Sequence, residues 1–564
     1  MATTTEERIY IVPAFDGGMQ RRSTKFLAQQ REVLFAKNTD FQYKLGGIAK
    51  ALGYTKKGNS ISGTPNILGC GSLNTSGGVD KILAFAGTDA YVWDGGTTWT
   101  AQSRSYSASQ LFETERFLDQ LFEVNGLTDV PENYDGATWS QTRNITDMPK
   151  SKFIKEYAVR LFLFNLNLPV GGNFPSRIWF SDLPVNNAIT WGFESGTDLA
   201  STAASATVTS AGGAFQTRNI KVGDPFFIVG GNNDGEYEVQ SVNSQTSITL
   251  TKTVTNTNTN QSFWVGGNYF DVARDNSDVG MGLGKNSDRI LFFKRFSLWK
   301  FLKGDTDESD SLIEIKGVPG TVSHRSITNV RDWTFYWSDT GLWRCNGVTS
   351  QLMSNSMQEI VDGIDPTSLD DIVGWSVGDR IVKMFLGDIN NTTTGLVINK
   401  CVYCYDAFSN ASWVEEYDDT IRASVKWIES SALKNFIFSS DGEVFQSENG
   451  NAYNGNAFPM EVETYFYFPI APEVSINFTR FKIYTEHGRE INTQFKLAYF
   501  DGRIDDDWRR LHLKDKTEHE QEWRVPETEN RAAGFALKFI ESEATNARPV
   551  IERVAAYYTG GEIR

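Results

Sequence analysis

The chain has 564 residues, a formal net charge of −16, 13% aromatic residues and 49 glycines against 15 prolines. This length exceeds what one hydrophobic core supports, so we expect two to four domains. The acidic excess argues against tight binding to nucleic-acid phosphates, which requires clustered lysine and arginine side chains.

The four cysteines are too few for a disulfide scaffold in a chain of this length. The N-terminal sequence MATTTEERIYIVPAF lacks a basic region followed by an apolar segment, and no apolar run approaches the ~20 residues that span a bilayer. We therefore expect no signal peptide, no membrane anchor, and a protein that is assembled in a reducing cytoplasm.

The first 70 residues mix several patterns. Residues 10–12 (YIV) predict a strand, and residues 28–37 (AQQREVLFAK) predict a turn of helix. The Gly-Gly pair at 46–47 and the Gly-Tyr pair at 53–54 indicate a loop and a turn.

A hairpin unit then recurs seven times. Each copy has an apolar strand, a turn with Gly, Asp or Ser, and a second aromatic strand, often followed by Asp-Gly, Asn-Gly or Trp. Glycine and the Asp-Gly pair suit such turns because they tolerate positive φ angles. The copies lie at 81–99, 116–139, 158–182, 288–301, 326–347, 379–413 and 433–450.

Units of this size cannot bury their own apolar faces, so they must pack against one another. Hairpin units with a loose spacing, in places ~40 residues, are typical of a β-propeller. A large β-sandwich with ordinary hairpins is the alternative.

The gap between residues 191 and 288 is too long for a connection between blades. It contains IKVGDPFFIVGGNNDGEYEVQSVNSQTSITLTKTV (220–254), whose short strands suffice for a small SH3-like barrel inserted at a loop tip. An Asn/Gly-rich stretch at 447–458 marks a boundary, and six short alternating strands follow it. They predict a C-terminal β-sandwich.

The predicted fold class is therefore all-β. Residues 71–195 and 268–450 form a β-propeller, residues 196–267 an inserted small barrel, and residues 459–564 a β-sandwich. Residues 1–70 close or flank the propeller.

The sequence predicts no catalytic, cofactor-binding or metal site. Cys401 and Cys404 form a CxxC pair in a strand-like segment, whereas reactive CxxC thiols lie at a helix N-terminus. A structural zinc ion needs four ligands, and there is no second CxxC pair. His324 has no nucleophile motif beside it, and GxSxG, HExxH and GxxxxGK[ST] are all missing from the sequence.

Three further segments match functional motifs only in part. Residues 280–288 (GMGLGKNSD) are glycine-rich but lack the strand-then-helix context of a phosphate loop, so we expect an ordinary loop. Residues 305–316 (DTDESDSLIEIK) have Asp and Lys where an EF-hand has Gly and Glu. Residues 338–343 (SDTGLW) are close to the Ser-x-Asp-x-Gly-x-x-Trp turn of sialidase propellers, but no spacing supports the arginine cluster, tyrosine nucleophile and carboxylate base of those enzymes.

The N-terminal segment and the hairpins contain a series of short motifs in a defined order. Residues 17–18 are Gly-Gly, residues 36–40 read AKNTD, and residues 46–54 begin with Gly-Gly and end with Gly-Tyr. The segments FAGTDAYVWDGGTTW, RIWFSDLPVNNAITW and GTVSHRSITNVRDWTFYWSDTGLWRCNG extend the match. Over residues 10–450 the chain resembles the β-propeller tail hub and nozzle proteins of short-tailed phages, including tail tubular protein B and phage stabilisation proteins.

This resemblance implies a structural protein of the virion without enzymatic activity or cofactor. It implies a subunit of the phage tail, six copies of which form a ring around the DNA ejection channel. Adaptor, fibre or needle proteins of the tail are the implied partners, and DNA passes through without specific binding. An acidic channel wall would repel phosphate, so we expect excess Asp and Glu on loops that face the channel.

Two other functions stay open at this point. One is a tail component that binds, or binds and cleaves, a receptor or glycan, which needs a pocket of clustered carboxylates or aromatic residues on one face of the propeller. The other is a structural protein of a long tail or of the capsid with the same fold.

Overall fold

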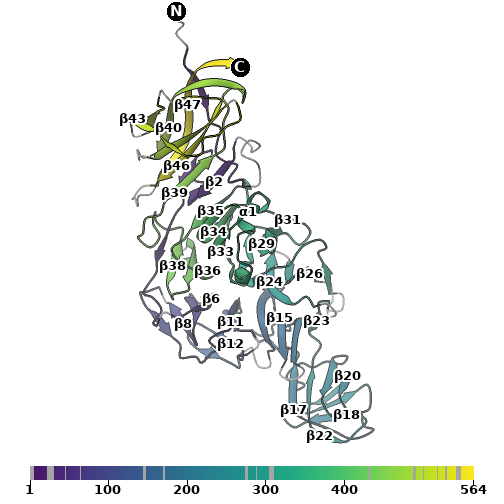
Figure 1. Ribbon diagram of the computed structural model, residues 1–564. Helices are drawn as coiled ribbons and strands as arrows, with labels where there is room; N and C mark the ends of the chain where they lie inside the picture. The colour runs from purple at the N-terminus through teal and green to yellow at the C-terminus, as the bar shows by residue number, and fades with distance from the viewer. Residues whose placement is uncertain are drawn as a thin grey trace, which may run out of the picture.

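The computed structural model describes all residues except 1–5, 22–30, 45, 64, 94, 127, 144–147, 169–171, 274–276, 287–288, 304–309, 430–431, 487–490, 500, 518, 527–529, 542–547 and 564. A two-sheet sandwich lies near both termini, a propeller occupies the middle, and a small barrel lies at the far end (Figure 1). The predicted all-β fold class, with propeller, inserted barrel and C-terminal sandwich, is confirmed.

Six separate four-stranded antiparallel sheets form blades of the propeller (Figure 1). They are β6–β9 (Ile67–Asn74, Asp80–Ala86, Asp89–Trp93, Trp99–Ala101), β10–β13 (Glu113–Phe117, Gln120–Val124, Glu132–Tyr134, Trp139–Ser140), β14–β16 with β23 (Lys150–Tyr157, Arg160–Leu168, Gly172–Phe180, Tyr269–Asp271), β24–β27 (Gly280–Asn286, Arg289–Lys294, Leu298–Leu302, Ser311–Glu314), β28–β31 (Thr328–Val330, Trp333–Ser338, Gly341–Cys345, Ser350–Leu352), and β36–β38 with β5 (Ile421–Glu429, Ala432–Ser439, Val444–Ser447, Tyr54–Lys56).

A further four-stranded meander occupies the position of a blade between β28–β31 and β36–β38. It consists of β32 (Val373–Val377), β33 (Ile381–Asn391), β34 (Leu396–Asp406) and β35 (Ser412–Glu416). The first strands of all these units contact one another in turn, in the order β6, β10, β14, β24, β28, β32, β36 and back to β6. Each of the seven hairpins found in the sequence lies in one of these units.

The middle strands of the blades are apolar without alternation because neighbouring blades cover both of their faces. Strand β15 reads RLFLFNLNL, and eight of its nine residues are buried. Aromatic rings fill the space between blades: the ring of Phe162 in β15 lies 6.3 Å from that of Phe292 in β25. This packing explains the high aromatic content of the chain.

The closed barrel interrupts the third blade. Its strands pair in the order β17 (Glu194–Ser201), β18 (Thr207–Ser210), β21 (Ser247–Leu250), β20 (Gly235–Ser244), β19 (Pro225–Val229) and β22 (Asn258–Val265). Alternate side chains such as Val208, Ile248 and Leu250 point into its core. The chain then returns as β23, the last strand of the same blade.

Two sheets form the sandwich, and one of them is continuous with the propeller. The first contains β1 (Arg8–Ile11), β3 (Thr39–Asp40), β4 (Ile48–Lys50), β40 (Val474–Glu486), β43 (His512–Lys516), β44 (Glu520–Arg524), β45 (Arg531–Ala532) and β47 (Val550–Ile563). The second contains β2 (Val33–Lys37), β39 (Met460–Thr464), β41 (Asn492–Ala498), β42 (Arg509–Arg510) and β46 (Gly534–Glu541), and β2 joins it to β35 of the meander. Phe481 and Phe535 meet between the sheets with ring centroids 5.0 Å apart.

The N-terminal segment divides between the two large domains. Strands β1 to β4 belong to the sheets of the sandwich, whereas β5 is the outermost strand of the blade β36–β38. Of the turn of helix predicted at 28–37, residues 28–30 lie outside the described residues; the prediction is wrong for residues 33–37, which form β2. This strand pairs with β39 on one side and with β35 on the other, and such long-range pairing overrides local helix propensity.

The loop predicted at 280–288 is also wrong, since residues 280–286 form β24, the first strand of a blade. Its glycines allow close approach of neighbouring side chains: a Cβ on Gly282 would lie 2.7 Å from His324 Nδ1, and one on Gly280 would lie 2.6 Å from the ring of Phe164. Helical structure among the described residues is confined to α1 (Gln358–Val361) and 3₁₀ turns at His324–Ser326, Asn355–Met357 and Pro366–Asp371.

Candidate functional site at the propeller axis

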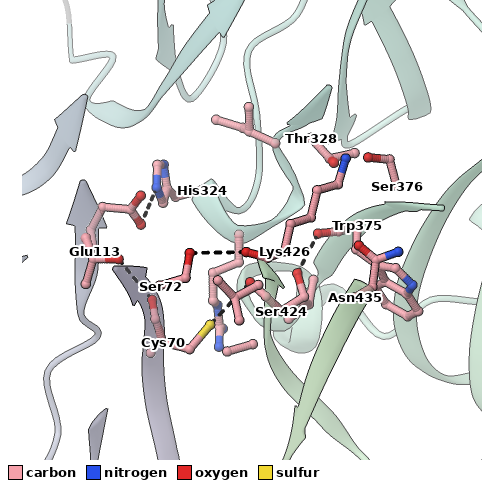
Figure 2. A pocket seen from close by; sticks show the side chains of 18 of the residues that line it. Cys70, Ser72, Glu113, His324, Thr328, Trp375, Ser376, Ser424, Lys426 and Asn435 are labelled. Atoms are coloured by element: carbon pink, nitrogen blue, oxygen red, sulfur yellow. Dashed lines mark hydrogen bonds and ion pairs between the residues drawn. The ribbon is translucent and has the colours of Figure 1, made fainter. Parts of the chain in front are cut away.

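The first strands of the blades surround a cavity on the axis of the propeller. Its volume is about 410 Å³, and its lining comes from β6, β10, β14, β28, β32 and β36, with the 3₁₀ turn His324–Ser326 at one side (Figure 2). The first strands present alternate side chains toward this space, so each blade contributes a few residues to a common lining.

Side chains on the first strands donate hydrogen bonds to the backbone of the preceding blade. Thr114 Oγ1 donates to the carbonyl of Cys70 (3.0 Å), and Cys70 Sγ donates to that of Ser424 (3.2 Å). Ser424 Oγ donates to the carbonyl of Gly374 (3.0 Å), and Ser376 Oγ donates to that of Asn329 (2.9 Å). These bonds connect β10, β6, β36, β32 and β28 around the axis.

Ion pairs extend the same set of connections to β14 and β24. Lys285 in β24 pairs with Glu156 in β14, and Lys155 Nζ in β14 lies 2.7 Å from Glu115 in β10. Burial alone would lower the pKa of Lys155, but the negative charges of Glu115 and Glu113 outweigh this effect and raise it. Lys155 therefore stays charged and committed to its carboxylate partner.

His324 and Arg325 lie on the 3₁₀ turn at the side of the cavity. His324 Nε2 is 2.5 Å from Glu113 Oε2 (Figure 2). The His324 ring lies 4.6 Å from that of Phe153. The Arg325 guanidinium donates to the carbonyls of Arg422 and Asp370, at 2.9 Å each. It also lies 3.0 Å from the carboxylate of Asp371.

Lys426 in β36 differs from the other cations of the lining. Its backbone carbonyl accepts a hydrogen bond from Ser72 (3.1 Å), while its side chain extends into the cavity on the side of Thr328 and Ser376 (Figure 2). Burial lowers the pKa of Lys426, and the negative charge of Asp379 counteracts this only in part. The described lining thus has three cations and one carboxylate.

This charge arrangement suits the holding of an anion better than acid–base hydrolysis. Glycosidic cleavage ordinarily uses two carboxylates that flank the bond. Among the described residues lining the axial cavity, Glu113 is the single carboxylate, and it is paired with His324. An adjoining cavity of about 550 Å³ shares Glu113 and adds only Asp370, whose side chain is exposed.

The structure does not bring the two CxxC cysteines into this cavity. Cys401 and Cys404 are fully buried in β34, and burial raises the pKa of both thiols. Three residues apart on a strand, their side chains point to opposite faces and cannot bind one ion together. Within the described part of the chain, no group of three or more His, Cys, Asp or Glu side chains is placed to hold a metal ion.

The sialidase-like segment 338–343 forms a structural hairpin turn. Ser338 Oγ accepts a hydrogen bond from the Thr340 amide (3.1 Å), and Thr340 Oγ1 accepts one from Trp343 Nε1 (2.8 Å). Gly341 has φ = 114°, a backbone conformation that side chains rarely adopt. The EF-hand-like residues Asp305, Asp307 and Ser309 lie outside the described residues.

The axial lining was not assembled from the sequence because its residues are scattered over 366 positions, from Gly69 to Asn435. The usable signal was indirect. Once the hairpins are assigned to blades, the strand that precedes each hairpin is the innermost one, and polar residues on it become candidates. His324 and Arg325 directly precede such a strand, β28.

No helix in the described ranges is long and apolar enough to cross a membrane. No family model and no curated protein sequence matches the chain.

Several solved structures share a weak likeness with it. YCF48 from Cyanidioschyzon merolae is 10% identical (70% of this chain, 98% of that one, TM-score 0.27). Apo AztD from Citrobacter koseri is 9% identical (74% and 96%, TM-score 0.29), and the phage phi92 endosialidase is 10% identical (75% and 65%, TM-score 0.20). At these TM-scores the assignment of the fold rests on the sheet topology of the chain itself.

Proposed function

We propose that this protein is a structural subunit of a bacteriophage tail, a nozzle or hub component that assembles into a ring around the DNA ejection channel of the virion. The observation that carries the proposal is the location of the N-terminal motif residues on which the resemblance to tail hub and nozzle proteins rests. Asn38, Gly53 and Tyr54 converge at the joint between the propeller and the sandwich.

Asn38 is fully buried and holds three segments together. It adopts φ = 55°, which asparagine tolerates better than most residues. Its amide donates to the carbonyl of Val414 (2.8 Å), and its side-chain oxygen accepts from the amide of Glu416 (2.8 Å). Its side-chain nitrogen donates to the carbonyl of Pro459 (2.7 Å), so one residue links β35 to the start of β39.

Gly53 and Tyr54 form the second half of this joint. A Cβ on Gly53 would lie 1.9 Å from the carbonyl oxygen of Ala452, so no side chain fits there. The Tyr54 ring stacks on that of Tyr453 at 4.8 Å, and its hydroxyl donates to Asp419 (2.7 Å). The resemblance therefore rests on residues with a definite task, the fixing of the propeller relative to the sandwich, as a rigid ring subunit requires.

The closed propeller axis supports a channel that lies outside each single propeller in such an assembly. The first strands are connected around a cavity of about 410 Å³, which has no room for a duplex. A DNA channel would consequently form between copies of the chain, through heterologous contacts that close a ring. Because the chain has a net charge of −16, a channel wall rich in Asp and Glu would let DNA slide without adhesion.

Electron microscopy of the purified full-length protein, combined with light scattering to count copies, tests this proposal. We expect closed rings, six-membered by the resemblance, with a central opening wide enough for a DNA duplex and an acidic wall. A protein that stays monomeric at tens of micromolar and cleaves glycan substrates would overturn the proposal in favour of a glycan-processing tail component. A ring with a basic wall would contradict the proposed passage of DNA.

A further inference from the structure

Cationic side chains outnumber carboxylates in the lining of the axial cavity, although the whole chain is acidic. Lys155, Arg325 and Lys426 line it, opposed by Glu113 alone among the described lining residues. Its volume of about 410 Å³ falls within the range of cavities that bind small molecules, ~300–1,000 Å³. A cationic, partly enclosed cavity attracts anions more strongly than the same charges do in bulk water.

Two of the three cations are already occupied by protein acceptors. Lys155 Nζ lies 2.7 Å from Glu115, and Arg325 donates to two carbonyls and to Asp371. Lys426 Nζ has no acceptor at hydrogen-bonding distance among the described residues. Burial lowers the pKa of this ammonium group. A partly buried ammonium group without an acceptor is unfavourable, so this position gains stability from a bound anion.

The surroundings of Lys426 supply further donors. Its side chain extends toward Thr328 and Ser376 (Figure 2). The Ser376 hydroxyl is bound to the carbonyl of Asn329 (2.9 Å), which leaves the Thr328 hydroxyl as the neighbouring donor. Asn435, directly opposite Lys426 in the register of β36 and β37, adds an amide to the same lining.

We propose that the propeller axis is a binding site for a small oxyanion, a carboxylate or a phosphate group, held by the ammonium group of Lys426 with the Thr328 hydroxyl and the Asn435 amide beside it. Arg325 and Lys155 contribute charge to the site without releasing their protein partners. The site lies within a single chain, so it does not depend on the assembly of a ring.

Calorimetric titration and thermal unfolding of the full-length protein with two probes, inorganic phosphate and glucuronate, test the site. Ionic strength is held constant with chloride, because screening by salt weakens all charge interactions. We expect saturable binding of at least one probe at one site per chain and a rise in unfolding temperature. Binding of phosphate indicates a phosphate ligand, and binding of glucuronate indicates a carboxylate ligand.

Lys426→Met should weaken this binding at least tenfold, as expected for the loss of a charged hydrogen bond of ~1.5–3 kcal/mol. Lys434→Met is the matched control, because Lys434 lies on the next strand but pairs with Glu429 and does not line the cavity; it should bind as the unaltered protein does. Lys426→Gln repeats the test if the Met variant misfolds. The proposal would be overturned if neither probe bound in a saturable way or raised the unfolding temperature beyond the effect of chloride at the same ionic strength. Unchanged affinity in both Lys426 variants would also overturn it.

Discussion

The buried ion pair between Lys50 and Glu541 offers the sharpest test of how the N-terminal segment is held. Lys50 Nζ in β4 lies 2.8 Å from Glu541 Oε2 at the end of β46, and the two side chains are 1% and 3% exposed. The Lys50 ammonium group also lies 4.7 Å from the centre of the Phe458 ring. The pair thus joins the two sheets of the sandwich across their interior.

At 2.8 Å the gross Coulomb attraction is about 6 kcal/mol for an effective dielectric constant of ~20. The desolvation of two ions, several kcal/mol each, offsets most of it. Lys50→Met removes the ammonium group that lies 2.8 Å from this buried carboxylate, so we expect the free energy of unfolding to fall by about 3–5 kcal/mol. Glu541→Gln should lower it by a similar amount.

The double variant Lys50→Met/Glu541→Leu removes both charges and fills the space with apolar side chains. We expect its stability to lie within about 1 kcal/mol of the unaltered protein, well above either single variant. Hydrogen exchange of the peptide that covers β46, measured across a urea series, reports local unfolding where a multi-domain chain gives no single two-state transition. Single-variant losses below about 1 kcal/mol, or a double variant weaker than both, would refute this reasoning.

Three other predictions concern buried groups. Burial and the facing carboxylate of Glu132 raise the pKa of Glu123 well above its usual range. The folded state therefore keeps a proton that the unfolded chain releases, and stability falls as pH rises from about 4.5 toward the folded-state pKa. Glu123→Gln should abolish this fall, measured by urea unfolding at pH 5 and pH 8. The same loss of stability between the two pH values in both proteins would contradict the prediction. The Arg177 guanidinium lies 4.1 Å and 4.0 Å from the centres of two aromatic rings and pairs with a carboxylate beside the barrel. Arg177→Met should lower the free energy of unfolding by about 2–4 kcal/mol, which calorimetry would show as a lower transition temperature. Cys401 and Cys404 should react with a thiol reagent only after unfolding; rapid reaction in the native state would show that β34 opens.

Local patterns sufficed to predict the hairpins of the blades. In the segment 326–347, Ser338 to Gly341 forms the turn and Asn346 the next one, where its side chain accepts hydrogen bonds from the amides of Val348 and Thr349. Turn chemistry and apolar runs close together in the sequence determine such units, so the sequence alone reveals them. The repetition of these units then implied the propeller.

Pairings over long sequence distances left no comparable signal. Strand β5 has three residues and completes a blade whose other strands lie almost 400 positions later. Strand β2 reads VLFAK, a run too short to separate strand from helix by periodicity. The continuity of one sheet through β35, β2 and β39 follows from tertiary packing, which no local pattern encodes.

The axial site was hidden for the same reason. Glu113 and His324 are 211 positions apart, and neither lies in a recognisable motif. Lys426 sits in the strand SVKWIE, where a lysine between apolar residues ordinarily indicates the exposed face of a strand. Only the closure of the blades into a ring turns that face toward the axis.

The same closure constrains any passage of DNA. Widening the axis enough for a duplex would break the hydrogen bonds from Thr114, Cys70, Ser424 and Ser376 to neighbouring blades, together with the ion pair of Lys155. These bonds connect successive blades around the ring. Opening the axis would therefore require breaking them between the rigid blade sheets. In the proposed nozzle, such a propeller would act as a rigid spacer with a closed axis, the channel would form between the outer surfaces of neighbouring copies, and the joint at Asn38 would hold the sandwich in place.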